Sequence, residues 1–170
     1  MLADRQGNAS IELACGLAEE VVRTFGEIRL RVFGTSMVPA ILPGDLVSIH
    51  RAKLQDISTG EVVLFLQKRR LFVHRVVDRK VMAAWNSPEE PRLITRGDRL
   101  RHNDLPVSSP ELLGRVVSIE RGNRKVELLA SGPNHLIAPL LQSSDRVTSV
   151  YLRLAAFWPA LFLRRAKCQV

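Results

Sequence analysis

Three short segments carry the residue types from which a nucleophile, its base and an orienting acid are built. Ser36 lies in the segment 34–39 (GTSMVP), and His74 follows it by 38 residues. Asp98 and Asp104 lie in a third segment, six residues apart. A serine hydroxyl needs a neighbouring base to take its proton, and a neutral imidazole is suited to that task. The residue types and their order therefore predict a site for nucleophilic catalysis.

Either of the two aspartates can serve as the acid partner of His74. A carboxylate on the far side of the imidazole orients the ring and stabilises the positive charge that forms on it. Such a group is recognised by geometry, not by its position in the chain. Asp98 and Asp104 are both also ordinary turn residues. The sequence leaves the two open, and we expect one of them to be structural.

The residues around Ser36 suit the approach of a substrate. Gly34 allows a substrate strand to come close to the backbone, and Pro39 fixes a turn after Met37 because it lacks a backbone donor. Backbone amides near Ser36, together with the Thr35 hydroxyl, could form an oxyanion hole. We therefore expect this loop to bind the substrate as well as to carry the nucleophile.

Each of these residues, taken alone, also has a structural interpretation. A serine beside a glycine is most often a turn former, and a lone histidine in a strand is more often a satisfied core residue. His74 shares a strand face with Phe72 and Val76, which is typical of core packing. Only the combination of the three segments favours a functional site.

The elements that must position these residues are predominantly β. From residue 28 onward, short β-rich runs alternate with glycine, proline and aspartate, and residues 86–91 are predicted to form a loop. The expected strands are 28–33, 45–50, 61–66, 71–78, 80–85, 92–95, 113–120 and 124–129. Such spacing predicts a mainly β fold, a curled antiparallel sheet or partly open barrel. Ser36 would lie in the loop after the first strand, and His74 on a neighbouring strand.

Two segments of helical character flank the predicted sheet. Residues 9–25 predict an amphipathic helix capped by Ser10, with apolar residues at helical spacing: Ile11, Leu13, Ala14, Leu17, Val21 and Val22. The apolar stretch 147–163 predicts a second helix near the C-terminus. We therefore expect an N-terminal helical segment at 1–26, a β-rich domain at 27–130, and a linker with an apolar and basic tail at 131–170.

The tail has the composition of a segment that contacts a membrane surface. It is shorter than the ~20 apolar residues of a spanning helix, and it is interrupted by Arg153 and Pro159. A basic cluster follows it at Arg164, Arg165 and Lys167, which favours anionic headgroups. We expect peripheral membrane contact, with packing on protein as the alternative. With neither a cleavable signal peptide nor a clear transmembrane helix expected, the protein is predicted to be peripherally membrane-associated or cytoplasmic.

Composition narrows the function further. The 170 residues, 46% of them hydrophobic, can bury one sizeable core. The formal net charge of +8 comes from scattered basic residues with few aromatic neighbours, so we expect a solvated basic surface and no nucleic-acid partner. His50, His102 and His135 lack the cysteine neighbours or helical spacing of metal ligands, so no metal site is expected.

The quoted segments resemble the signature of the signal peptidase I family, within the LexA-like peptidase superfamily. His74 followed by Arg75 is similar to the histidine form of the endoplasmic reticulum and archaea, because the common bacterial form has lysine before the arginine. The resemblance covers roughly residues 30–120, including 60–65 (GEVVLF) and 113–117 (LGRVV). Two features depart from it: the N-terminal helix is too polar to span a membrane, and Arg99-Leu100 replace two asparagines.

What the resemblance implies is a serine endopeptidase without a cofactor. Ser36 would be the nucleophile and His74 the base, supported by Asp98 or Asp104, and small residues would precede the scissile bond of the substrate. The substrate would be an extended peptide or preprotein segment paired against a sheet edge. The oligomeric state is not indicated.

Two alternatives stay open. One is a LexA-like regulator that cleaves its own chain, with Cys15-Gly16 as the target bond, although the chain lacks a recognisable DNA-binding module and has no lysine in the base position. The other is a catalytically silent peptide-binding or scaffold module, because a fold does not prove an activity.

Overall fold

The computed structural model describes residues 2–83, 89–122 and 124–126, and the side chains among them from residue 12 onward except that of Ala83. The predicted linker and tail at 131–170 lie outside these residues, and the division into three segments stays a prediction. In chain order, the elements are α1 (Leu2–Phe25), β1 (Glu27–Arg31), β2 (Leu46–Arg51), the 3-10 helix η1 (Leu54–Asp56), β3 (Val62–Gln67), β4 (Arg70–Ala83), β5 (Glu89–Arg96), β6 (Leu112–Arg121) and β7 (Arg124–Val126).

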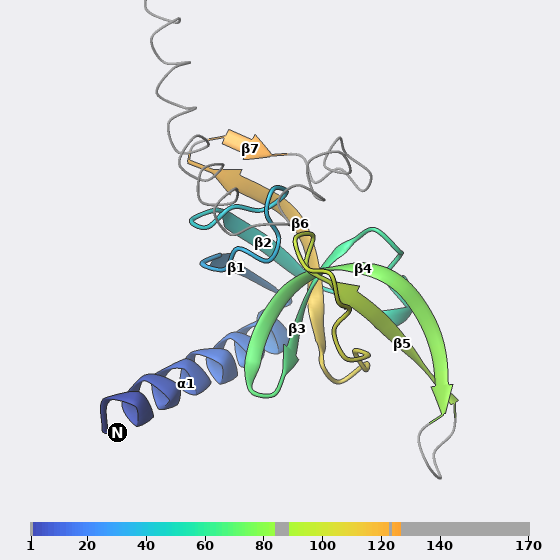
Figure 1. The fold of residues 1–170 in the computed structure, drawn as a ribbon, viewed down its shortest axis with the longest axis horizontal. Coiled ribbons are helices and arrows are strands. Elements are labelled where there is room, and N and C mark those ends of the chain that lie inside the picture. The colour runs from blue at the N-terminus through green and yellow to red at the C-terminus, as the bar shows by residue number, and fades with distance from the viewer. Residues whose placement is uncertain (1, 84–88, 123, 127–170) are drawn as a thin grey trace, which may run out of the picture.

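The strands form one antiparallel sheet that does not close. Its order is β1-β2-β6-β3-β4-β5, and β7 pairs with β6. Figure 1 shows the sheet strongly curled, with α1 extending from one side and the long β4–β5 hairpin curving away on the other. The prediction of a mainly β fold with a curled, partly open antiparallel sheet and an N-terminal helix is confirmed.

β3 lies at the centre of the fold and is buried on both faces, which explains its continuous apolar run. Because strand side chains alternate between faces, Val62 and Leu64 enter one core, which also holds Val22 of α1. Val63 and Phe65 enter a second core on the other face, built with η1, β4 and β5. Phe65 is fully buried. Two cores therefore share one strand, and the second core lies under the strand that carries His74.

The region from β4 to β5 differs from the sequence prediction. The expected strands 71–78 and 80–85 are one strand, β4, which bends at an irregularity between Val76 and Asp78 where its register to β5 shifts. A bulge allows a strand to turn without ending, and the pattern of apolar residues alone does not reveal it. The expected loop at 86–91 is also wrong in part, because Glu89–Pro91 belong to β5.

The N-terminal helix was predicted correctly in type but not in its start or its buried face. Ser10 is not a cap, since α1 already begins at Leu2. Leu13 and Leu17 are 76% and 61% exposed, whereas the residues that pack inward are Cys15, Ala18 and Val22. Gly26 ends the helix: its φ is +79°, and its amide donates to the Val22 carbonyl at 3.0 Å, a common helix ending. The helix therefore docks by a narrow stripe of small side chains.

Among the helices that the structure describes, none has both the length and the hydrophobicity to cross a lipid bilayer.

Candidate functional site

Ser36, His74 and Asp104 form a continuous hydrogen-bonded line. The Ser36 Oγ lies 3.0 Å from His74 Nε2, and His74 Nδ1 lies 2.7 Å from Asp104 Oδ2. A carboxylate only accepts hydrogen bonds, so the proton of the neutral ring is on Nδ1. Nε2 is then an acceptor, and the serine hydroxyl donates to it. This is the tautomer that a general base for Ser36 requires.

Strand β4 holds the imidazole rigidly. His74 pairs with Val63 of β3, on the face that enters the second core. Its ring packs against two aromatic rings, with centroid distances of 6.1 Å to Phe65 and 5.8 Å to Phe72, and it is only 4% exposed. His74 is therefore packed as a core residue and is fully buried, while its two nitrogens bond to the side chains of Ser36 and Asp104.

The loop that carries Ser36 is closed at its base by Asp45. Its backbone carbonyl accepts from the Val32 amide at 2.9 Å, and its buried carboxylate accepts from the Leu42 amide at 2.8 Å. Arg121 of β6 donates to both oxygens of this carboxylate. These contacts join both ends of the loop to β6, so Ser36 is carried by an anchored loop.

A second segment touches the Ser36 loop directly. The Arg99 amide donates to the Ser36 carbonyl at 2.9 Å. Gly97 is packed so closely that a Cβ placed on it would lie 2.7 Å from the Ser36 carbonyl oxygen and 3.0 Å from the Ser36 Cβ. Only glycine fits at this position without a shift of the loop. The turn after β5 therefore determines where the serine lies.

The two aspartates have different surroundings. Asp104 faces His74, and its Oδ2 also accepts from the Thr95 hydroxyl at 2.7 Å. Asp98 instead receives two hydrogen bonds from Arg75, at Oδ1 and Oδ2, both 2.8 Å long. Arg75 also donates to the Gly60 carbonyl at 2.7 Å. The structure thus brings Asp104, and not Asp98, to the histidine.

The other residues expected around Ser36 are distributed between core and surface. Met37 is 2% exposed and packs in the first core, and Pro39, which follows a cis peptide bond, is also buried. The Thr35 carbonyl accepts from the Val38 amide at 3.2 Å, which forms the turn. Gly34 is exposed, and a Cβ there would meet no atom within 4 Å. Of these four residues, Gly34 is the one open to an approaching peptide.

Thr95 and Gly97 were not assigned roles from the sequence. Both lie in the segment 95–98 (TRGD), which was noted only for Asp98. Thr95 is fully buried, and its carbonyl accepts from the Asp104 amide at 2.8 Å while its hydroxyl binds the carboxylate. The sequence did contain a signal for these roles. A threonine near a strand end with a glycine two residues later is typical of a tight turn in which the threonine side chain forms a hydrogen bond.

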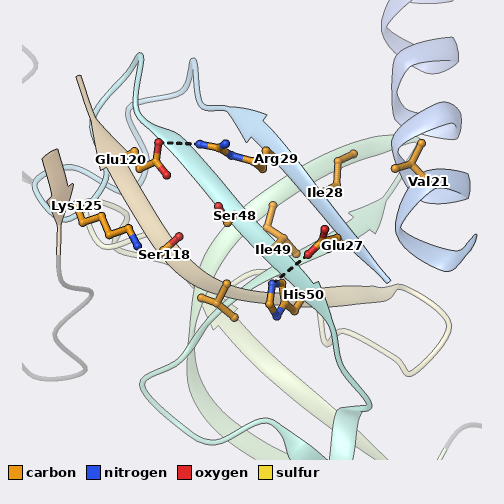
Figure 2. A pocket seen from close by; sticks show the side chains of 11 residues that line it. Val21, Glu27, Ile28, Arg29, Ser48, Ile49, His50, Ser118, Glu120 and Lys125 are labelled. Carbon is orange, nitrogen blue, oxygen red and sulfur yellow. Dashed lines mark hydrogen bonds and ion pairs between the residues drawn. The ribbon is translucent and has the colours of Figure 1, made fainter. Parts of the chain in front are cut away.

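A pocket of about 510 Å³ lies elsewhere, lined by Val21 of α1 and by residues of β1, β2, β6 and β7. Figure 2 shows Val21 of α1 at one side of this pocket, while Arg29 pairs with Glu120 and His50 with Glu27 across the strands. None of its lining residues belongs to the Ser36 site. Within the described part of the chain, no three His, Cys, Asp or Glu side chains are grouped to hold a metal ion.

Comparison with known proteins assigns the family. No curated protein matches the chain. The family model described as Peptidase S24-like matches residues 3–101, more than half of the chain, and this range includes Ser36 and His74. Asp104 lies three residues beyond the match, and the specific likeness to signal peptidase I is not part of it. With a Peptidase S24-like match over most of α1, the serine loop and the histidine strand, the chain belongs to this family of LexA-like, serine-type peptidases.

Proposed function

We propose that the protein is a serine endopeptidase in which Ser36 is the nucleophile, His74 the general base and Asp104 the group that orients the base. The observation that supports this proposal most is the unbroken line of hydrogen bonds from the Ser36 hydroxyl through both ring nitrogens to the Asp104 carboxylate. In this line the serine hydroxyl donates to the acceptor nitrogen of the imidazole, which is the contact that proton transfer from the nucleophile to its base requires.

In this mechanism the Ser36 Oγ attacks the carbonyl carbon of the scissile peptide bond while its proton passes to His74 Nε2. Asp104 stabilises the imidazolium that forms. The same Nε2 then gives its proton to the leaving amine nitrogen, the C–N bond breaks, and an acyl ester remains on Ser36. Water, deprotonated by His74, hydrolyses the ester and regenerates the serine.

The peptide would bind in an extended form, so that main-chain hydrogen bonds give affinity and side-chain pockets give specificity. The exposed backbone at Gly34, two residues before Ser36, supports this mode because no side chain blocks the approach. We further propose signal-peptidase-type specificity, with small residues before the cut. This finer assignment rests on the likeness of the Ser36, His74-Arg75 and Asp98 to Asp104 segments to that family.

The test is Ser36→Ala, which removes the nucleophile and only one half-buried oxygen. Cleavage of peptides with small residues before the cut should fall by at least ~10³-fold, because the acyl intermediate cannot form. Thermal unfolding should change little. Ser109→Ala, a change at an exposed serine outside the site, is the matched control and should retain full activity. Equal turnover by Ser36→Ala and the parent, in protease-free preparations, would exclude the serine mechanism.

Self-cleavage is a second candidate, and the Peptidase S24-like match favours it, because this family includes LexA-like proteins that cleave themselves. The proposed bond, Cys15-Gly16, lies inside α1, and Cys15 is buried. This helical bond would have to leave α1 and become extended before Ser36 could attack it. Intact mass measured during incubation separates the two candidates: self-cleavage gives two fragments at a rate independent of protein concentration, and Ser36→Ala gives none.

A further inference from the structure

A row of hydrogen-bond donors crosses the pocket of Figure 2. Arg29 of β1 pairs with Ser48 of β2, and Ser48 pairs with Ser118 of β6, so the three side chains lie side by side on one face of the sheet. Neighbouring strands are about 4.8 Å apart, so the row spans about 10 Å. Lys125 of β7 extends toward Ser118 at the end of this row (Figure 2).

Most of these donors have no acceptor in the described part of the chain. Arg29 gives one N–H group to Glu120, at 2.7 Å. The hydroxyls of Ser48 and Ser118 and the ammonium group of Lys125 make no hydrogen bond or ion pair with another described residue. Both serines are half-buried. A ligand with acceptor oxygens can therefore bind here without breaking a hydrogen bond between protein groups.

The pocket also has an apolar side. Val21 of α1 and Ile28 of β1 lie beside each other, away from Lys125 (Figure 2). A bulge in β6 adds Val117, which the pairing with β2 skips. Consecutive strand residues normally face opposite sides of a sheet, yet Val117 and Ser118 both line the pocket. The bulge thus turns an apolar group and a hydroxyl group to the same side.

Charge decides between the anions that such donors can hold. The pocket carries two carboxylates: Glu120 pairs with Arg29, and Glu27 lies 3.5 Å from His50. Lys125 is the one charged lining residue without an ion pair among the described residues. A phosphate monoester brings nearly two negative charges beside both carboxylates, whereas a carboxylate ligand brings one. The single unpaired cation therefore matches a monoanion.

We infer that this pocket binds a carboxylate ligand with an apolar portion. Its oxygens accept hydrogen bonds from Lys125, Ser118 and Ser48, and its apolar portion packs against Val21 and Ile28. The volume of about 510 Å³ falls within the range of ~300–1,000 Å³ that is usual for small-molecule sites. A free carboxylic acid and the C-terminal end of an apolar peptide both offer this chemistry. The pocket is separate from the proposed peptidase site, so binding does not depend on catalysis.

The test titrates the full chain with octanoate and with octanamide, which keeps the apolar chain but lacks the charge. Backbone amide shifts in NMR spectra give both the affinity and the location. Octanoate should bind at least about tenfold more tightly, with shift changes at Arg29, Ser48 and Ser118 and none at Ser36. Octyl phosphate should bind more weakly than octanoate. Equal affinities for octanoate and octanamide would overturn the inference, and tighter binding of octyl phosphate would overturn the choice of a carboxylate.

Variants of the donors test the assignment of the site. Lys125→Gln should weaken octanoate binding by about tenfold and leave octanamide binding unchanged. Lys53→Gln, at an exposed lysine outside the pocket, is the matched control and should bind like the parent. Ser118→Ala should weaken octanoate binding by about fivefold, whereas Ser109→Ala should not. Thermal unfolding checks the fold of each variant. Unchanged octanoate affinity in Lys125→Gln would also overturn the inference.

Two acetylated apolar tripeptides, one with a free C-terminal carboxylate and one with a C-terminal amide, distinguish the sources of the ligand. Ser36→Ala is used in this arm so that the peptides stay intact. Tighter binding of the acid peptide than of octanoate indicates a peptide end, and the reverse order indicates a free acid; either result supports the carboxylate site. If neither octanoate nor the acid peptide binds, or if the acid and amide peptides bind equally, the inference is wrong.

Discussion

At the scale of single residues, the hydrogen bonds of the site determine which nitrogen of the His74 ring carries its proton. Asp104 fixes the proton of His74 on Nδ1, which leaves Nε2 to accept the hydrogen bond from the Ser36 hydroxyl. Thr95 in turn donates to the same carboxylate oxygen. Asp98, only six residues away, has a different partner, Arg75. Two aspartates that the sequence makes equivalent are therefore expected to respond differently to the same substitution.

Asp104→Asn should lower kcat by roughly 10³- to 10⁴-fold, because an amide can donate to Nδ1 and so favour the tautomer with the proton on Nε2. Asp98→Asn is the matched comparison. It removes one charged acceptor from Arg75, so it should lower the free energy of unfolding by about 1–3 kcal/mol and affect kcat far less. Peptide kinetics and thermal unfolding of both variants are the measurements. A larger kcat loss in Asp98→Asn would reverse the assignment.

Thr95 is a positioning residue, since it acts on the imidazole only through Asp104. Thr95→Val keeps the shape of the side chain but removes the hydroxyl donor. We expect kcat to fall by about tenfold with KM unchanged, the size of one lost hydrogen bond to a charged group. Thr95→Ser restores the donor and should recover most of kcat. Equal losses in the two variants would mean that Thr95 contributes packing alone.

At the scale of elements, the site is assembled from segments distant in sequence and held by backbone contacts. β4 presents His74, while the loop between β1 and β2 presents Ser36. The turn after β5 lies against that loop through Gly97 and the Arg99 amide. After the turn, the chain returns beside β5, where the Asp104 amide donates to Thr95 and Val107 pairs with Leu93. The distance between serine and histidine therefore depends on the packing of this turn.

Gly97→Ala should lower kcat by about 10²-fold, because its methyl group would push the Ser36 backbone and a shift of about 1 Å in a reacting group has that cost. Gly16→Ala is a suitable control. Its methyl group would meet nothing within 4 Å on α1, and it should stabilise the helix by about 0.5–1 kcal/mol. The measurements are peptide kinetics and thermal unfolding. Full activity in Gly97→Ala would show that the turn does not position Ser36.

At the scale of the whole molecule, one curled sheet separates two cores and carries the site on its β4–β5 side. α1 packs on the first core, and η1 packs on the second. The mixed-charge pocket of Figure 2 lies beside α1, and none of its lining residues belongs to the Ser36 site. The predicted tail at 147–167 lies outside the described residues, and its membrane contact is a proposal.

We expect that tail to attach the protein to anionic vesicles, with an apolar face bearing Phe157 and Trp158 and with the basic cluster Arg164, Arg165 and Lys167. The measurement is vesicle flotation of the full chain and of a form that ends at Asp145. Only the full chain should float, and 1 M salt should weaken its binding, because screening then acts within about 3 Å. If both forms float alike, or neither does, the tail packs on protein.

Local pattern was sufficient to predict several features of this protein. The short β-rich runs between turn residues predicted the antiparallel sheet, because alternation and turn chemistry are local properties of a chain. The spacing of Ser36, His74 and the two aspartates pointed to the segments that meet. The helix at 9–25 was recognised from its period, but its buried face was not, because Leu13 and Leu17 stay exposed while Cys15, Ala18 and Val22 are buried, and helical spacing alone does not decide which apolar stripe packs.

Only the tertiary structure distinguished Asp104 from Asp98, since that choice depends on which side of the turn after β5 faces β4. It also showed that the predicted strands 71–78 and 80–85 form one strand, β4. The bulge after Val76 is defined by the pairing of β4 with β5, and the sequence around it does not indicate it. Thr95 and Gly97 acquired their roles in the same way. Their contacts are made to residues brought near by packing, and a linear pattern carries no information about such distances.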